Sequence, residues 1–342
     1  MGWSLLSSEG FYQVFMDNKQ QRWIKARQYT PENLGLARKA LAEIMSGKTV
    51  SAAVQRYPLP EGGYLGKHAL VAAYHHLVTS GEIRADQRLL ARIRMKPTRT
   101  LSGVTTVTVI TKPYPCPGQC IFCPTDTRMP KSYLPDEPGA RRGLEHDFDP
   151  HAQVAARINA LQAVGHPTYK IELLILGGTW SVYPRTYQEW FIQRCFDALN
   201  GCDSETLSQA QHRNETAAHR NVGLVVETRP DRINPDELRW MRYLGVTKVQ
   251  IGVQSLDDSL LELNRRGHTV QQVLEAVALL RGAGFKIVAH WMPNLLGATL
   301  DSDRRDFQRL FDILCPDEIK IYPNQLLENC DLYTIWLQGG FQ

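Results

Sequence analysis

Six short apolar segments that alternate with helical patterns limit what most of this chain can fold into. The apolar segments are rich in Val, Ile and Leu and cover residues 104–112, 170–176, 221–228, 248–255, 285–292 and 318–323. Helical patterns lie between them, near 149–164, 185–199, 234–243, 270–283 and 301–314. Continuous apolar strands separated by helices are typical of a parallel sheet buried on both faces. We therefore expect an α/β fold over residues 99–330, a partial (β/α)6 barrel with about three quarters of the eight-stranded form.

Residues 1–98 lack these alternating apolar segments, and their pattern predicts a small, basic helical domain. Thr30-Pro31-Glu32 is a helix start signal, with Thr as N-cap and Pro in the first turn, and an amphipathic run follows to about residue 46. Two further helical patterns cover 64–80 and 84–95. No internal repeat or low-complexity segment is evident.

Positive charge is concentrated at the front of the chain. Residues 1–112 carry 16 Lys and Arg against 7 Asp and Glu, whereas the remaining residues carry 23 against 28. Within 84–99, six basic residues accompany a single acid, Asp86, and the first three of them repeat every four residues on one predicted helical face. The alternative is a solvated face, but we favour phosphate binding. The six residues are Arg84, Arg88, Arg92, Arg94, Lys96 and Arg99.

Cysteine usage and hydropathy indicate the compartment. The chain has seven cysteines, an odd number, and three of them lie within 116–123. This pattern suits a metal site in a reducing cytoplasm better than a disulfide framework. No apolar run approaches the ~20 residues that span a bilayer, and the first residues lack the basic-then-apolar order of a secretory signal. We expect a cytoplasmic protein with no membrane partner.

The three clustered cysteines predict an iron–sulfur centre. Cys116, Cys120 and Cys123 have C-x3-C-x2-C spacing directly after the first predicted strand. Three thiolates this close can hold three irons of a [4Fe–4S] cube and leave the fourth iron open. An open iron can chelate the amino and carboxylate groups of S-adenosylmethionine (SAM). A structural zinc site with His146 or His151 as fourth ligand is the alternative, and the sequence leaves it open.

Polar and glycine residues end three of the predicted strands. Gly177-Gly178-Thr179 follows the second strand, Glu227 ends the third and Gln254 ends the fourth. Parallel strands bring these ends to one rim, so the residues indicate a site there. Glycines permit close approach of the backbone to a ligand, although a tight strand–helix turn would also use them.

The cysteine spacing, with an aromatic residue before the third cysteine, resembles the radical SAM superfamily. Together with SYLPDEP, ILGGTW, VETRPD, IGVQS, RGHT and IKIYP, it resembles the catalytic subunit of Elongator and the related tRNA carboxymethyluridine synthases, from about Lys96 to Trp336. The resemblance implies that Cys116, Cys120 and Cys123 ligate the cluster. It also implies SAM contacts by five strand-end residues: Gly177, Gly178, Thr179, Glu227 and Gln254.

The resemblance further implies a reaction. Family members take a hydrogen from the methyl group of acetyl-CoA, add the carbon radical to carbon 5 of the wobble uridine, and hydrolyse the thioester to leave a carboxymethyl group. An external electron donor is then needed. Lys170 matches a family lysine that contacts acetyl-CoA, yet it opens the second strand, roughly 23 Å from the catalytic rim at 3.3 Å per residue.

The family binds tRNA through its basic N-terminal region, which fits the charge asymmetry. Within the long loop 124–148, Tyr133 and Arg142 are then candidates to stack on a base or hold a phosphate. Tyr133 has an alternative role, pinning the loop. Other Elongator-type subunits are partners only in a eukaryotic-type assembly.

One departure from the family concerns its acetyltransferase domain. No R/Q-x-x-G-x-G/A turn follows the barrel, and we expect residues 331–342 to begin a linker to a domain outside this sequence. Two alternatives therefore accompany wobble-uridine modification. One is a tRNA-binding module without turnover. The other is a different radical SAM enzyme on tRNA, such as a methylthiotransferase.

Overall fold

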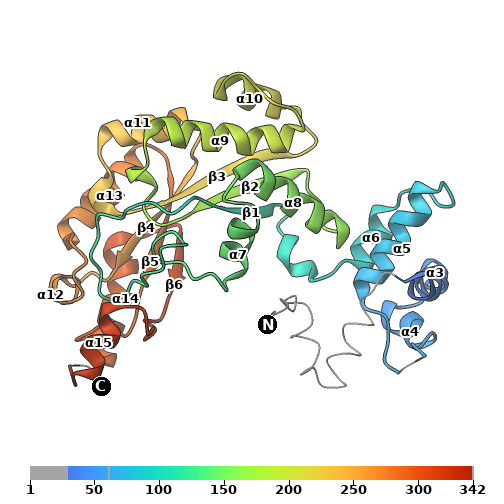
Figure 1. The fold of residues 1–342 in the computed structure, drawn as a ribbon, viewed down its shortest axis with the longest axis horizontal. Coiled ribbons are helices and arrows are strands. Elements are labelled where there is room, and N and C mark those ends of the chain that lie inside the picture. The colour runs from blue at the N-terminus through green and yellow to red at the C-terminus, as the bar shows by residue number, and fades with distance from the viewer. Residues whose placement is uncertain (1–29, 61, 341–342) are drawn as a thin grey trace, which may run out of the picture. The chain divides into compact units, whose positions relative to one another are not determined.

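The structure is a computed structural model that describes residues 30–60 and 62–340, and the chain divides into two compact units (Figure 1). The first unit is Met1–Gly103 with Asn159–Thr168, and the second is Val104–Ile158 with Tyr169–Gln342. The sequence pattern places 159–168 in the barrel instead. These residues belong to the first unit because the Val164 carbonyl accepts from Met95 N (3.2 Å) and the Gly165 carbonyl accepts from Arg94 Nε (2.8 Å).

In its described residues the first unit is helical, as the sequence predicts. Its core is built from side chains that are fully buried, among them Leu41, Ile44, Leu70 and Ile93. Its elements are α3 (Pro31–Met45), α4 (Val50–Gln55), α5 (Lys67–Thr79), α6 (Gln87–Ile93) and the 3-10 turn η1 (Pro97–Thr100).

Helix α6 is shorter than its pattern suggests. Asp86 caps it, accepting from the backbone N of Arg88 (2.8 Å) and Leu89 (3.2 Å), so the helix begins at Gln87. Arg84 therefore precedes the helix, and the prediction that it shares a helical face with Arg88 and Arg92 is wrong.

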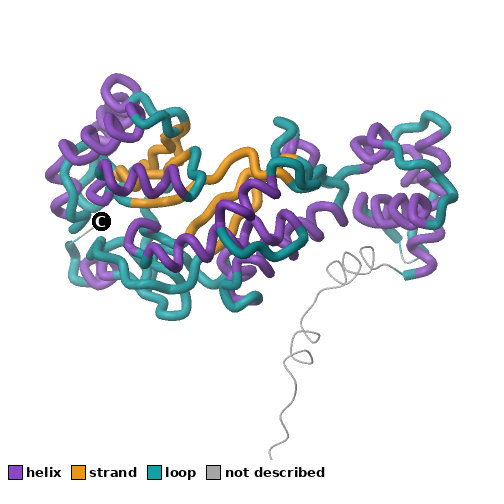
Figure 2. Tube along the Cα trace, turned by 90° about the horizontal axis from the view of Figure 1, so that it is seen from above, coloured by secondary structure: helices purple, strands orange, loops and turns teal. Residues whose placement is uncertain are grey.

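The second unit contains the predicted sheet. Six strands pair in the order β1-β2-β3-β4-β5-β6, every pair is parallel, and the open sheet curls into a partial barrel, which confirms the predicted fold. Figure 2 shows the strands as a curved layer with helices along it. The central strands are almost wholly buried because both faces are covered. The strands are β1 (Thr105–Ile110), β2 (Lys170–Leu176), β3 (Arg220–Thr228), β4 (Lys248–Gln254), β5 (Lys286–Trp291) and β6 (Glu318–Ile321).

Helices connect consecutive strands. Five of the predicted helical patterns are present as α8 (Pro150–Ala163), α9 (Arg185–Asn200), α11 (Pro235–Tyr243), α13 (Val270–Gly282) and α14 (Leu300–Arg309), the last continuing as the π-turn η4 (Leu310–Leu314). Short elements that the sequence analysis missed are α7 (Pro138–Glu145), α10 (Leu207–Asn214), α12 (Asp258–Leu263), η2 (Trp180–Val182) and η3 (Pro230–Arg232).

The segment expected to open a linker is part of this unit. Residues Asp331–Leu337 form helix α15, and Leu332 is fully buried beside the cysteine loop. The backbone N of Leu332 donates to the Ile121 carbonyl (2.8 Å). The linker prediction is therefore wrong over α15, because this helix covers apolar side chains of the loop that carries the cysteines.

Among the helices that the structure describes, none is both long and apolar enough to cross a membrane.

Candidate active site

The cysteine loop crosses the carboxyl rim of the sheet. It leaves the end of β1, and its residues contact the segments that follow β2 and β4. Cys116 Sγ lies 3.6 Å from Thr179 Oγ1, after β2, and Arg266 Nη1, between α12 and α13, donates to Cys120 Sγ at 3.3 Å. The predicted cysteines and the predicted strand ends thus meet at one rim, as parallel topology requires.

Two glycines after β2 hold the backbone close to this loop. Gly177 and Gly178 have φ values of 145° and 88°, a region that side chains disfavour. A methyl group on Gly177 would overlap Thr111 Oγ1, and one on Gly178 would lie 3.2 Å from the Lys131 carbonyl. Both glycines and Glu227 line the same narrow gap between side chains at this point. Three of the five predicted SAM contacts therefore lie close together at the ends of β2 and β3.

Cys120 and Cys123, on the cysteine loop, form a pair of neighbouring thiols joined by a hydrogen bond. Both are buried, and Cys123 Sγ lies 3.1 Å from Ser132 Oγ. The hydrogen bond from the Cys123 thiol, helped by Arg266 and Arg229, lowers the pKa of Cys120 to about 5, in spite of burial. The same hydrogen bond and burial raise the pKa of Cys123. The lowered pKa of Cys120 favours its thiolate, which is the form in which cysteine binds metal.

Glu227 faces the long loop after the cysteines. Tyr133 OH donates to Glu227 Oε2 (2.6 Å), so Tyr133 ties the loop 124–148 to the end of β3. Burial raises the pKa of Glu227, opposed by the Tyr133 hydrogen bond and by the charges of Lys320 and Arg266. The structure thus supports the pinning role of Tyr133.

A polar network that the sequence patterns did not predict lies inside the sheet. Gln250 Oε1 accepts from Lys320 Nζ (2.8 Å) and lies 2.8 Å from His290 Nε2. Burial, with Lys320 and Arg266 nearby, lowers the pKa of His290 to about 3, so the imidazole is neutral. Glu227 pairs in register with Gln250, and His290 with Lys320. A polar residue inside each apolar strand was the signal that could have found them.

Gln254 ends β4 with a left-handed backbone, φ 68°. Its carbonyl accepts from Met292 N (2.9 Å), whereas its buried side-chain Oε1 has no hydrogen-bond partner in the described ranges 30–60 and 62–340. Two other buried atoms in the described ranges also have no hydrogen-bond partner, Arg229 Nη1 and Arg266 Nε. Buried polar groups are normally paired, so three such atoms at one rim fit a polar ligand.

The sequence model of the Radical SAM superfamily matches residues 113–310, the part of the chain that holds this rim. The chain belongs to the radical SAM superfamily. It is 45% identical over 262 residues to the tRNA uridine(34) acetyltransferase of Methanocaldococcus jannaschii, covering 74% of this chain and 48% of that protein. It is 34% identical over 267 residues to human Elongator complex protein 3, covering 74% and 49%. A solved archaeal structure, Methanocaldococcus infernus Elp3 with an N-terminal deletion, aligns with a TM-score of 0.60 at 40% identity, over 70% of this chain and 50% of that one. The chain spans about half the length of the curated relatives it matches.

Membership of the superfamily implies a [4Fe–4S] cluster and SAM. No three His, Cys, Asp or Glu side chains in the described part of the chain are grouped to hold a metal ion, with or without His146 or His151. In a cubane each thiolate binds a different iron, so its ligands do not converge on one ion. The donor set fits the cluster. Three free cysteines lie on one loop, beside two buried arginines and Gln254, each of which has one polar atom without a partner among the described residues.

Two of the basic residues predicted to bind RNA have structural partners. Arg92 donates to the carbonyls of Ile44 (3.1 Å) and Lys48 (2.6 Å), at the end of α3, and Arg94 donates to Gly165. Both guanidinium groups thus donate to main-chain carbonyls, and their contact with tRNA phosphate stays a prediction. The other four are exposed and have no side-chain hydrogen bond or ion pair with any described residue: Arg84, Arg88, Lys96 and Arg99.

The structure also shows where two further predicted site residues lie. Arg142, on α7, donates to the Thr108 carbonyl of β1 (3.0 Å), and burial lowers its pKa, so it covers the edge of the sheet. Lys170 is exposed at the opposite end of β2 from Gly177 and is not part of the candidate active site.

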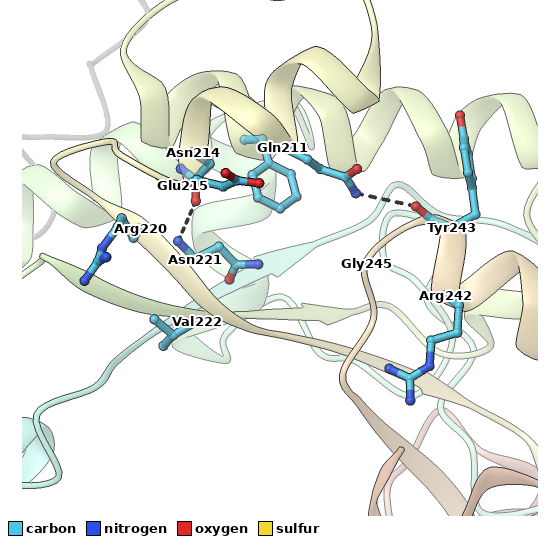
Figure 3. A pocket seen from close by; sticks show the side chains of 10 residues that line it. Gln211, Asn214, Glu215, Arg220, Asn221, Val222, Arg242, Tyr243 and Gly245 are labelled. Atoms are coloured by element: carbon cyan, nitrogen blue, oxygen red, sulfur yellow. Dashed lines mark hydrogen bonds between the residues drawn. The ribbon is translucent and has the colours of Figure 1, made fainter. Parts of the chain in front are cut away.

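A larger pocket, of about 510 Å³, lies at the amino end of β3 (Figure 3). Gln211 and Arg242 line it, and their side chains donate to main-chain carbonyls at the end of α11 and nearby. Asn214 accepts from the backbone N of Asn221 (2.6 Å). These polar groups serve the structure, and the pocket is remote from the cysteines, so it is not the candidate site.

Replacing Glu227 with Gln tests the electrostatics of the rim. A carboxyl whose folded-state pKa is raised loses stability as the pH rises through that value. Glu227→Gln is therefore expected to raise the melting temperature of the apo-protein by a few degrees at pH 8, and the difference is expected to vanish at acidic pH, where the wild-type carboxyl is protonated. Thermal denaturation across pH measures this. The exposed Glu262→Gln is the control, and an equal effect from it would contradict the burial of Glu227.

Proposed function

We propose that this chain carries the radical-generating and tRNA-binding part of an enzyme that modifies the wobble uridine of tRNA. The observation that carries the proposal is the meeting of Cys116, Cys120 and Cys123 with the Gly177–Thr179 turn at one rim. The proposal is supported by the 45% identity with the archaeal tRNA uridine(34) acetyltransferase.

In this proposal the three cysteines ligate the [4Fe–4S] cluster. Bound there, the cluster supplies the electron that breaks a carbon–sulfur bond of SAM and yields a carbon radical. The chain supplies position and a dry environment. The lowered pKa of Cys120 favours the thiolate that an iron of the cluster would bind, and the Ser132 hydroxyl and Arg266 contact the two buried sulfurs.

The strand ends hold SAM. The backbone of Gly177 and Gly178 approaches the methionine end, since neither residue has a side chain in the way. The Thr179 hydroxyl lies beside Cys116, and the unpaired side-chain oxygen of Gln254 would be an acceptor for a donor group of SAM. Glu227 is available to the ribose hydroxyls on the face that Tyr133 does not occupy.

We assign the uridine to the interior of the rim, where Lys320, His290 and Gln250 form the polar network. Buried polar groups at the mouth of a barrel are suited to the edge of an unstacked base. Acetyl-CoA as the source of a carboxymethyl group belongs to the proposal, but Lys170 does not support it because it lies at the other end of β2.

Anaerobic reconstitution tests the function. The expected result is about four irons per chain and SAM cleavage that tRNA stimulates. Adding acetyl-CoA is expected to change the product on the tRNA only when the wobble base is uridine. Transfer of sulfur or a methyl group to tRNA would instead show a different radical SAM enzyme, and tRNA binding without SAM cleavage would show a binding module.

The free basic residues give a second test. Replacing Arg84 and Arg88 with Gln is expected to weaken tRNA binding and to reduce the slope of log K against log salt by about one unit for each phosphate that is no longer neutralised. Filter binding over a range of salt concentrations measures both effects. The control is Arg304→Gln, an exposed arginine of the barrel unit paired with Asp301. An equal weakening of binding in the control would show that net charge alone matters.

A further inference from the structure

Arg266 is a buried arginine beside the cysteine loop. Only 7% of its surface is exposed. Its Nη1 donates to Cys120 Sγ (3.3 Å) and its Nη2 donates to the Gly252 carbonyl (2.7 Å), which leaves Nε without a partner in the described residues. The guanidinium therefore joins the end of β4 to the middle cysteine.

Within 30–60 and 62–340 no carboxylate forms a salt bridge with Arg266, although the charges of Arg266 and of the Glu227 carboxyl act on each other. Burying an unpaired charge costs on the order of several kcal/mol, so the arrangement requires an anion. Asp231 is paired with Arg229, whose Nε donates to it at 2.8 Å. Of the two acceptors that the Arg266 guanidinium contacts in the described residues, only the sulfur of Cys120 can carry a negative charge, whereas the Glu227 carboxyl acts on Arg266 without a hydrogen bond.

Surrounding residues fix Arg266 in place. Arg229 Nη2 donates to the Arg266 carbonyl (2.8 Å), so one buried arginine holds the backbone of the other. A methyl group on Gly252 would overlap the guanidinium of Arg266, and one on Gly118 would overlap that of Arg229. Two glycines, one on each side, thus allow both cations to approach the loop.

We propose that Arg266 is a positioning residue that tunes the iron–sulfur cluster by placing a fixed positive charge against Cys120. Reduction adds one electron, and therefore one negative charge, to the centre. A nearby cation stabilises the reduced form more than the oxidised form, which raises the reduction potential. A low-potential one-electron donor then reduces it more completely. The proposal rests on the cysteines being the ligands.

Redox titration of the reconstituted protein tests this without turnover. With dithionite as the reductant and no SAM present, the reduced cluster is followed by electron paramagnetic resonance. Arg266→Gln is expected to lower the equilibrium constant for reduction at least tenfold, which corresponds to ~59 mV for a one-electron couple. Arg265→Gln is the matched control, because Arg265 is the neighbouring residue but is exposed and pairs with Asp331. The control is expected to titrate like the wild type.

Arg266→Lys covers the case in which the Gln variant fails to load iron. Lysine keeps the charge but loses the fork that contacts both Cys120 and Gly252, so its potential is expected to stay within tenfold of the wild type. A shift in the lysine variant as large as that of Gln, or equal titrations for Arg266→Gln and Arg265→Gln, would overturn the proposal. Wild-type protein without about four irons would instead overturn the ligand assignment itself.

Discussion

Replacing Cys120 with Ala is expected to abolish the cluster and all SAM cleavage while tRNA binding survives. Reconstituted wild type should hold about four irons per chain, and the variant close to none, because Cys120 is the thiolate that lies between Cys123 and Arg266. Iron analysis, the visible spectrum and SAM cleavage measure the loss. Filter binding of tRNA reports on the rest of the chain.

The design needs a second variant, because removing Cys120 leaves the buried Arg266 without its anion and lowers stability. Cys116→Ala avoids this, since Cys116 is half-buried and contacts Thr179 instead of an arginine. It is expected to lose SAM cleavage equally. Cys202→Ser, on an exposed cysteine, is the control and should keep the cluster. SAM cleavage at the wild-type rate by either Cys116→Ala or Cys120→Ala would remove that residue from the ligand set.

The strands of the sheet were predictable because each one is determined by residues that are neighbours in the sequence. Each strand is a run of apolar residues bounded by polar ones, and β2 was predicted to the residue, as Lys170–Leu176. Parallel order then places every carboxyl end at one rim, which is why Cys116 and Thr179 could be assigned to one site from positions 63 residues apart.

The roles of individual arginines were not predictable because they depend on distant partners. Arg92 and Arg88 look alike in the sequence and both are exposed, yet Arg92 donates to the carbonyls of Ile44 and Lys48 while Arg88 has no side-chain partner among the described residues. The packing of α3 against the later helices decides which guanidinium group finds carbonyl acceptors. The same holds for Arg266, whose sulfur partner is 146 residues away.

The polar network was missed for a related reason. When β5 and β6 are considered singly, His290 and Lys320 look like isolated polar residues in an apolar strand and suggest no function. That the two residues belong to one network becomes evident when β5 pairs with β6, because this pairing places His290 opposite Lys320. A polar residue in a buried strand needs a partner from another strand, so pairing strands before interpreting residues would have exposed the network.

Replacing Gly177 with Ala is expected to disable SAM binding and to destabilise the barrel. Its φ of 145° is unfavourable for any side chain, and the added methyl group would overlap Thr111 Oγ1. Thr111 cannot move freely, because it is buried and its hydroxyl lies 2.8 Å from Tyr183 OH. Backbone strain and overpacking together predict a loss of about 2–5 kcal/mol in the free energy of unfolding. Denaturant unfolding of the apo-protein measures this loss, and SAM cleavage by the reconstituted variant measures the functional effect.

Two controls separate strain from overlap. Gly201 also has a positive φ, 70°, but a methyl group there meets no atom within 4 Å, so Gly201→Ala should cost only about 1–2 kcal/mol and leave SAM cleavage intact. Adding Thr111→Ala to Gly177→Ala removes the overlapping hydroxyl and should recover part of the stability. If the methyl group also blocks the approach of SAM, the double variant regains stability more than cleavage. Equal unfolding energies for Gly177→Ala and Gly201→Ala would show that the turn after β2 has room for a side chain, and the close backbone approach assigned to it would then be wrong.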